Sequence, residues 1–263
     1  MCIAAALFAT QAGAMEPARG ANPRPIIYFD PDANFRAIVT IKSLLDSFFR
    51  QSGLGDLSFQ PVQSQGELEK LLGAGNAEFV WVAASFLSQA RAKRLEPLLV
   101  PSSKQSTHYR KVLVDKGVGS AARLSAKTIA ATAADPGKVR ELLTRLLPGS
   151  IKLDGITGIP VAKDIDALLA LSFGQVDAAL VTPASIEVLR RINPAAVSGF
   201  RKVHETALIL RPVLCRVRGR VSGQRVEQLT NAVMKMSSHP DGRSAMQFMG
   251  FDEWVQFRPE MLR

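Results

Sequence analysis

The sequence predicts an α/β protein built from two lobes of related design. Strand-like apolar runs alternate with helix-like segments along most of the 263 residues, and this alternation favours mostly parallel sheets flanked by helices. A helix end, a glycine turn, an acidic residue, a short apolar strand and a new helix occur in Leu71–Leu87 and again in Leu168–Glu187. The length also suits two lobes better than one. The alternative interpretation is that this repeat arose by chance, as it can in any α/β protein.

Composition indicates a folded globular protein, with 47% hydrophobic and 21% charged residues. No stretch reaches the roughly 20 apolar residues needed to span a membrane. The net charge of +10 comes from basic residues scattered through the chain. Their densest cluster, Arg211–Arg225, lacks the interleaved aromatic residues of a base-stacking surface. A solvated basic face is therefore favoured, and no nucleic-acid partner is expected.

The N-terminus has the features of an export signal. Ile3–Ala9 is an apolar run, and Ala12–Ala14 is a small-x-small site, so we expect residues 1–14 to be a signal peptide. No basic residue precedes the apolar run, which indicates that the sequence is truncated at its start. A cytoplasmic protein with an apolar N-terminus is the alternative. Removal of Cys2 would leave only Cys215, which excludes an intramolecular disulfide and a thiol-based metal site.

The first lobe is expected to use residues 15–117 and 212–263. Its predicted strands are Pro25–Phe29, Leu57–Val62, Phe79–Ala83, Leu98–Val100 and Tyr109–Val114. Its predicted helices are Phe35–Phe49, a segment that starts with the Ser64–Glu67 capping box, Ser85–Arg94, and a C-terminal stretch, Val221–Phe248, broken at His239–Gly242. The small, polar segment Gly117–Ser125 is the predicted first boundary.

The second lobe is expected to use residues 118–211. Its predicted strands are Thr128–Thr132, Ile151–Ile156 and Val176–Val181, with one or two more in Phe200–Val217 that return across the boundary. Its predicted helices start at the cap-plus-proline pairs Asp135-Pro136 and Thr182-Pro183, with another at Val161–Phe173. A chain that leaves the first lobe and returns by two crossings would place a cleft at a hinge.

The sequence contains no recognisable catalytic set. The three histidines lie in unrelated contexts without metal-ligand spacing, and neither a nucleophile elbow nor a phosphate-binding glycine loop is present. Asp164 and Asp166 lie two positions apart on a predicted helix, point to different faces and are interpreted as surface residues. We therefore expect no enzymatic activity, no cofactor and no metal site.

Four predicted strands end in small or polar residues that begin a helix. The carboxyl ends of strands border the ligand crevice of open α/β sheets, and helix N-termini there favour anions. Each such junction taken alone is ordinary helix capping, so the prediction rests on their shared position in both lobes. The residues expected to line the cleft are Tyr28, Asp30, Ser85, Thr132, Asp135, Thr182 and Ser185.

The predicted roles differ along this set. Ser85, Thr182 and Ser185 would donate hydrogen bonds, Tyr28 would stack or donate, and Asp30 would bind any amine of the ligand. Asp135 faces the predicted cleft as a carboxylate that would repel an anion, unless it turns inward as a helix cap.

The chain resembles type 2 periplasmic solute-binding proteins, closest to the phosphate, phosphite and phosphonate branch of ABC transporter receptors. The resemblance rests on Leu71–Leu87, on Gly174–Ser185, and on a tail made of Met236–Arg243, Met249–Phe251 and Trp254. It implies two lobes joined by a two-strand hinge, closure on a ligand, and delivery of that ligand to a membrane permease.

Two departures bear on the ligand. The phosphonate binders carry a Ser/Thr-rich loop with a glycine where this chain has Thr132–Pro136, and a tyrosine is usual where this chain has Phe86. The sequence therefore predicts a periplasmic, monomeric binding protein for a small polar ligand, with phosphate- or phosphonate-like oxyanions among the candidates. The alternative is a sensor or accessory module of the same fold that docks on a partner protein.

Overall fold

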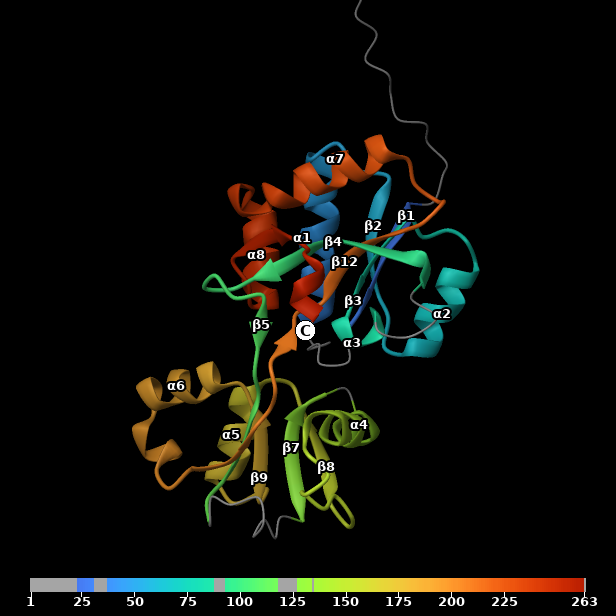
Figure 1. Cartoon of the computed structure of the whole chain (residues 1–263). Helices are drawn as coiled ribbons and strands as arrows, with labels where there is room; N and C mark the ends of the chain where they lie inside the picture. Colours follow the sequence, from blue (N-terminus) through green and yellow to red (C-terminus); the bar gives the residue numbers. More distant parts are fainter. Residues whose placement is uncertain (1–22, 31–36, 88–92, 118–126, 134, 263) are drawn as a thin grey trace, which may run out of the picture.

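The computed structural model describes residues 23–30, 37–87, 93–117, 127–133 and 135–262. Two α/β lobes lie one above the other, joined by narrow segments of chain near β5 (Figure 1). The predicted fold class is therefore confirmed. The predicted signal peptide, residues 1–14, lies outside the described residues.

The first lobe contains a six-stranded sheet in the order β13-β4-β12-β3-β1-β2. Its strands are β1 (Arg24–Phe29), β2 (Leu57–Pro61), β3 (Phe79–Val82), β4 (Leu95–Ser102), β12 (Val213–Val217) and β13 (Glu253–Gln256). Its helices are α1 (Ile38–Gln51), α2 (Gln65–Gly73), α3 (Ala84–Leu87), α7 (Gly223–Met234) and α8 (Pro240–Met249), with short 3₁₀ turns at Met236–Ser238 and Pro259–Leu262.

The second lobe contains a five-stranded sheet in the order β10-β6-β9-β7-β8. Its strands are β6 (Val112–Asp115), β7 (Thr128–Thr132), β8 (Thr157–Val161), β9 (Ala178–Val181) and β10 (Arg201–Glu205). Its helices are α4 (Pro136–Leu146), α5 (Asp164–Ser172) and α6 (Pro183–Ile192), followed by a 3₁₀ turn at Pro194–Val197.

Two short antiparallel strands join the lobes. β5 (His108–Tyr109) pairs with β11 (Ile209–Leu210), with Tyr109 opposite Ile209. We expected the first lobe to extend to residue 117, but β6 already belongs to the second sheet, because it pairs with β9 and β10. The first crossing therefore lies near residue 110, whereas the return crossing lies between β11 and β12.

Each lobe repeats one βαβαβ unit. β1-α1-β2-α2-β3 gives the sheet order β2-β1-β3, and β7-α4-β8-α5-β9 gives β8-β7-β9, with parallel pairing in both. The sequence repeat thus marks equivalent structural positions. The sheets are mixed rather than mostly parallel, because the strands added after a crossing, β12 and β6, run antiparallel to β3 and β9.

The first-lobe sheet is buried on both faces. Side chains of β1 alternate between two core clusters, with Ile26 and Tyr28 on the face covered by α1, and Ile27 and Phe29 on the face that contains Leu68 of α2. Burial on both faces explains the continuous apolar runs of the central strands. The second lobe has the same arrangement with smaller residues, as Ala130 and Ala131 of β7 illustrate.

One predicted strand is wrong, and two strands of the structure, β8 and β13, were not predicted. The strand expected at Ile151–Ile156 is wrong, since the edge strand is β8 and Ile151 instead packs into the core from a loop. The sequence of β8, Thr-Gly-Ile-Pro-Val, contains glycine and proline, which do not predict a strand. Gly158 is needed there because a Cβ at this position would lie 2.7 Å from the Cβ of Val139. The strand β13 was not predicted.

Candidate ligand cleft

A cavity of about 470 Å³ opens between the two lobes. We call it the interlobe cleft. It is bordered by the carboxyl ends of β1, β3, β7 and β9, as expected for a ligand site in α/β sheets. Its lining residues are Tyr28, Asp30, Trp81, Pro101, Ser103, Tyr109, Arg110, Lys111, Thr132, Asp164, Thr182, Pro183, Ala184, Arg211, Pro212, Met249, Gly250 and Phe251.

The first-lobe wall of the cleft is aromatic and tightly packed. The rings of Tyr28 and Trp81 lie 5.0 Å apart, and Trp81 also packs against Phe251 and Trp254. The Trp81 Nε1–H donates to the carbonyl of Pro212 at 3.0 Å. The Tyr28 hydroxyl donates a long hydrogen bond, 3.4 Å, to the carboxylate of Asp30. This wall therefore offers a largely apolar surface with one carboxylate.

The second-lobe wall is polar and is organised around Asp164, the first residue of α5. Its carboxylate accepts hydrogen bonds from the Thr132 hydroxyl at 2.9 Å and from the Thr182 backbone N–H at 2.7 Å. The hydroxyls of Thr182 and Ser185 lie 2.9 and 3.2 Å from the same carboxylate. We interpreted Asp164 as a surface residue, and that interpretation is wrong because the end of β8 brings α5 to the cleft edge.

Three cations on the segments that cross between the lobes line the cleft, and one of them, Arg110, forms an ion pair with Glu205 at 2.8 Å. Lys111 follows β5 and is only 3% exposed, and its side chain has no hydrogen-bond or ion-pair partner among the residues that the structure describes. Arg211 follows β11, and its Nε atom is buried without a described hydrogen-bond partner. Burial lowers the pKa of the Arg211 guanidinium, an effect partly offset by Tyr109, Asp252 and Asp30.

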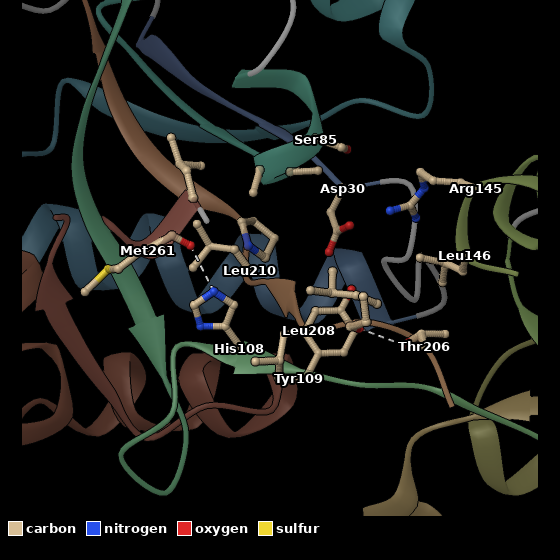
Figure 2. A pocket seen from close by; sticks show the side chains of 16 residues that line it. Asp30, Ser85, His108, Tyr109, Arg145, Leu146, Thr206, Leu208, Leu210 and Met261 are labelled. Carbon is tan, nitrogen blue, oxygen red and sulfur yellow. Dashed lines mark hydrogen bonds between the residues drawn. The ribbon is translucent and has the colours of Figure 1, made fainter. Parts of the chain in front are cut away.

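A second cavity of about 410 Å³ lies beside the hinge strands (Figure 2). We call it the hinge pocket; Asp30, Tyr109 and Pro212 line both cavities. Figure 2 shows Ser85 and Asp30 of the first lobe near Arg145 and Leu146 of the second. The His108 ring bonds to the carbonyl of Met261 at 2.9 Å, which fixes the C-terminal turn against this pocket.

The structure brings together some of the seven predicted residues. Tyr28, Asp30, Thr132 and Thr182 line the interlobe cleft. Ser85 lines the hinge pocket instead. Ser185 lies next to the cleft wall, 2.8 Å from the Thr182 hydroxyl, and is not a lining residue.

Of the two placements that the sequence offered for Asp135, the structure has the helix cap. Its exposed carboxylate accepts the Lys138 backbone N–H at 2.9 Å, so it caps α4 and does not line the cleft. The prediction that a carboxylate repels ligands at this point of the sequence does not apply to Asp135. The carboxylate that lines the second-lobe wall of the cleft is Asp164, which follows the end of β8.

Sequence reasoning missed Trp81, Lys111, Asp164 and Arg211 as cleft residues. A signal existed for Asp164, which follows the end of a strand and begins a helix, as the predicted residues do. Lys111 could have been noticed as one of two consecutive cations, Arg110 and Lys111, directly before the apolar strand Val112–Asp115. For Arg211, only the pairing of β5 with β11 shows that the residue lies at the cleft, and for Trp81 only the place of β3 inside the first-lobe sheet does.

Two α/β lobes, a two-strand hinge and a cleft at the strand ends define a two-lobed ligand-binding protein. Residues 31–262 match the family described as "ABC transporter, phosphonate, periplasmic substrate-binding protein". The chain therefore belongs to this family of periplasmic substrate-binding proteins, which are ligand-binding receptors for ABC uptake. No curated protein sequence matches the chain at a significant level.

Solved structures share the fold. A binding-protein component of a phosphonate ABC transporter from Pseudomonas aeruginosa has a TM-score of 0.64 at 11% identity, over 92% of this chain and 84% of its own. PhnD1 from Prochlorococcus marinus, in complex with methylphosphonate, has a TM-score of 0.63 at 10% identity, over 92% and 96%. A Xanthomonas citri protein bound to ATP has a TM-score of 0.60 at 16% identity, over 90% and 93%.

Proposed function

We propose that this chain captures a small polar ligand with an anionic group in the interlobe cleft and delivers it to the permease of an ABC transporter, without catalysing a reaction. The observation that carries this proposal is Lys111, a residue that is 3% exposed, lines the cleft and has no described hydrogen-bond or ion-pair partner for its side chain. Arg211 lines the same cleft as a second, partly desolvated cation. Both cations would attract the anionic group of a ligand.

The physical argument concerns the cost of burying a charge. A lysine almost never lies buried without a counter-ion, because desolvation of an unpaired ammonium is unfavourable. An anionic ligand at this point would supply the missing counter-charge and strong hydrogen bonds. The apolar first-lobe wall, formed by Tyr28, Trp81 and Phe251, would cover the rest of the ligand.

The family membership supports a permease partner and a periplasmic location. We further propose that the protein acts as a monomer and does not bind nucleic acid, since its basic residues are scattered and lack a stacking surface. In the part of the chain that the structure describes, no helix has the length and apolar character needed to cross a membrane.

The test is thermal unfolding and calorimetric titration with acetate, phosphate, phosphite, methylphosphonate, sulfate, amino acids and polyamines. A ligand at a hundred times its dissociation constant should stabilise the fold by about 2.7 kcal/mol, which raises the melting temperature by a few degrees. Lys111→Met should abolish binding of the responding solute, whereas Lys152→Met, at an exposed position, should leave it unchanged.

Two outcomes would overturn the proposal. A ligand that binds equally to the wild type and to a folded Lys111→Met variant would place the site elsewhere. A response to no solute of the panel, with binding to a partner protein instead, would favour the docking module that the sequence left as the alternative.

A further inference from the structure

Asp164 gathers the hydrogen-bond donors of the second-lobe cleft wall onto its own carboxylate. One oxygen accepts from Thr132, and the other is approached by the Thr182 N–H, the Thr182 hydroxyl and the Ser185 hydroxyl, at 2.7 to 3.2 Å. The donors come from the ends of β7 and β9 and from the start of α6. Residues distant in the sequence therefore converge on one anion that belongs to the chain.

The hydroxyl donors of this cluster already form hydrogen bonds within the chain. Each of the three hydroxyls has a single proton. The Thr132 proton is directed to Asp164, and the Thr182 and Ser185 hydroxyls lie 2.8 Å apart, so their protons are shared between each other and the carboxylate. No hydroxyl proton of this cluster is left for a ligand unless the carboxylate is displaced.

The cluster has the geometry of an anion site that is already filled. Hydroxyl groups and a backbone N–H at the start of a helix are the donors that bind phosphate-like groups in proteins. The start of α6 supplies both here, and the bound anion is the Asp164 carboxylate. An incoming phosphonate or phosphate at this wall would meet a like charge in place of free donors.

Two cations lie elsewhere in the same cleft. Lys111 lies between β5 and β6, and Arg211 lies between β11 and β12, so both are on the segments that cross between the lobes. The anionic end of a ligand is therefore directed toward the hinge. The Asp164 oxygen bonded only to Thr132 keeps acceptor capacity, so the opposite end of the ligand would meet an acceptor of hydrogen bonds.

We propose that Asp164 is a specificity-determining residue, a built-in anion that fills the second-lobe anion position and excludes phosphonate, phosphate and other tetrahedral dianions from it. The ligand class that fits has one anionic end at the hinge and a neutral or cationic hydrogen-bond donor facing Asp164. This inference rests on the proposed function, because it takes the interlobe cleft as the ligand site.

The test measures methylphosphonate and inorganic phosphate binding by calorimetry in the wild type and in Asp164→Ala. Removal of the carboxylate frees the donors, so the variant should bind methylphosphonate at least about tenfold more tightly than the wild type. Adding Thr182→Val to Asp164→Ala should remove this gain. Asp154→Ala, at an exposed position with no described hydrogen bond, should show none.

Two results would overturn the inference. One is wild-type binding of methylphosphonate as tight as in the variant; the other is a folded Asp164→Ala protein without any gain. If Asp164→Ala fails to fold, Asp164→Asn removes the charge while keeping the shape, and a smaller gain in the same direction is expected because the amide oxygen still accepts from some of the donors. The Lys111→Met titrations report separately on the proposed function, because a wild-type ligand that depends on Lys111 can exist whether or not Asp164 variants bind methylphosphonate.

Discussion

In the first lobe β3 is followed by Ala83, and in the second lobe the equivalent strand β9 is followed by Thr182. The next helices differ in the same way, since Phe86 is buried in the core whereas Ser185 contributes a hydroxyl to the Asp164 cluster. The two walls of the cleft thus have one scaffold and opposite chemistry. One wall is aromatic and core-like, and the other is a polar network.

The acidic residues before the two strands differ as well. Glu78 is buried and forms an ion pair with Arg24, whereas the equivalent Asp177 is exposed and accepts from the backbone and hydroxyl of Thr128. The same position before the strand thus carries a buried ion pair in one lobe and exposed hydrogen bonds in the other. The repeat therefore fixes where functional residues lie but not what they are.

The largest expected effect comes from breaking the aromatic wall. Trp81→Ala should lower the free energy of unfolding by about 3–5 kcal/mol, because it removes a large side chain packed against four other aromatic rings. Chemical denaturation measures this. Phe173→Ala in the second lobe, at a side chain that is 72% exposed, should change stability by less than about 0.5 kcal/mol. A loss below about 1 kcal/mol for Trp81→Ala would mean that this wall is not part of the core.

A smaller effect is expected at the start of the second helix of each repeat. Asp164→Asn should cost about 2 kcal/mol, since the amide replaces a charged acceptor of several hydrogen bonds. Gln65→Ala is the matched change in the first lobe, where the uncharged side chain donates to Glu69 within α2, and it should cost less than Asp164→Asn because no charged acceptor is lost. Equal losses in denaturant unfolding would contradict the asymmetry between the walls.

The third prediction compares Gly75 and Gly174, which occupy equivalent turns in the two lobes. Gly75 and Gly174 have φ angles of 87° and 70°, and a Cβ at either position would meet nothing within 4 Å. Gly75→Ala and Gly174→Ala should therefore each cost about 1 kcal/mol, purely from left-handed backbone strain. Gly149→Ala, at a position without a positive φ, serves as the control. Clearly unequal losses would mean that the two turns are not equivalent.

The smallest effect concerns Asp177 and pH. The Thr128 side-chain hydrogen bond, aided by backbone N–H groups of Lys127 and Thr128, lowers the Asp177 pKa below 3.8. The ionised carboxylate thus stabilises the fold above that value, and this contribution is lost as the pH falls through the folded pKa. Asp177→Asn should be less stable at pH 7 by under about 1 kcal/mol, because water screens the group.

Melting temperatures between pH 7 and pH 3 check this prediction. The difference between the wild type and Asp177→Asn should narrow below about pH 4. Asp154→Asn, at an exposed carboxylate without a described hydrogen bond, should show no such trend. A difference that widens on acidification would refute the assigned sign.

The sequence by itself determined the α/β class, the two related halves and most strand–helix junctions. Ser64 caps α2 and Asp135 caps α4, as predicted from local capping patterns. These features depend on apolar periodicity and on hydrogen bonds between residues three or four apart, so neighbouring residues are enough to specify them. Four of the seven predicted residues, Tyr28, Asp30, Thr132 and Thr182, also line the interlobe cleft.

Only the tertiary structure decided the polarity of the cleft. Asp164 was assigned to the surface from its spacing to Asp166, and this local pattern could not show its partners, Thr132 and Thr182, which lie 32 and 18 positions away. Lys111 and Arg211 face the same cleft because β5 and β11 pair across the hinge. Pairing between distant segments determines which side chains meet, and local sequence patterns do not predict this pairing. The scaffold follows from local physics, whereas the charges that select the ligand follow from long-range assembly.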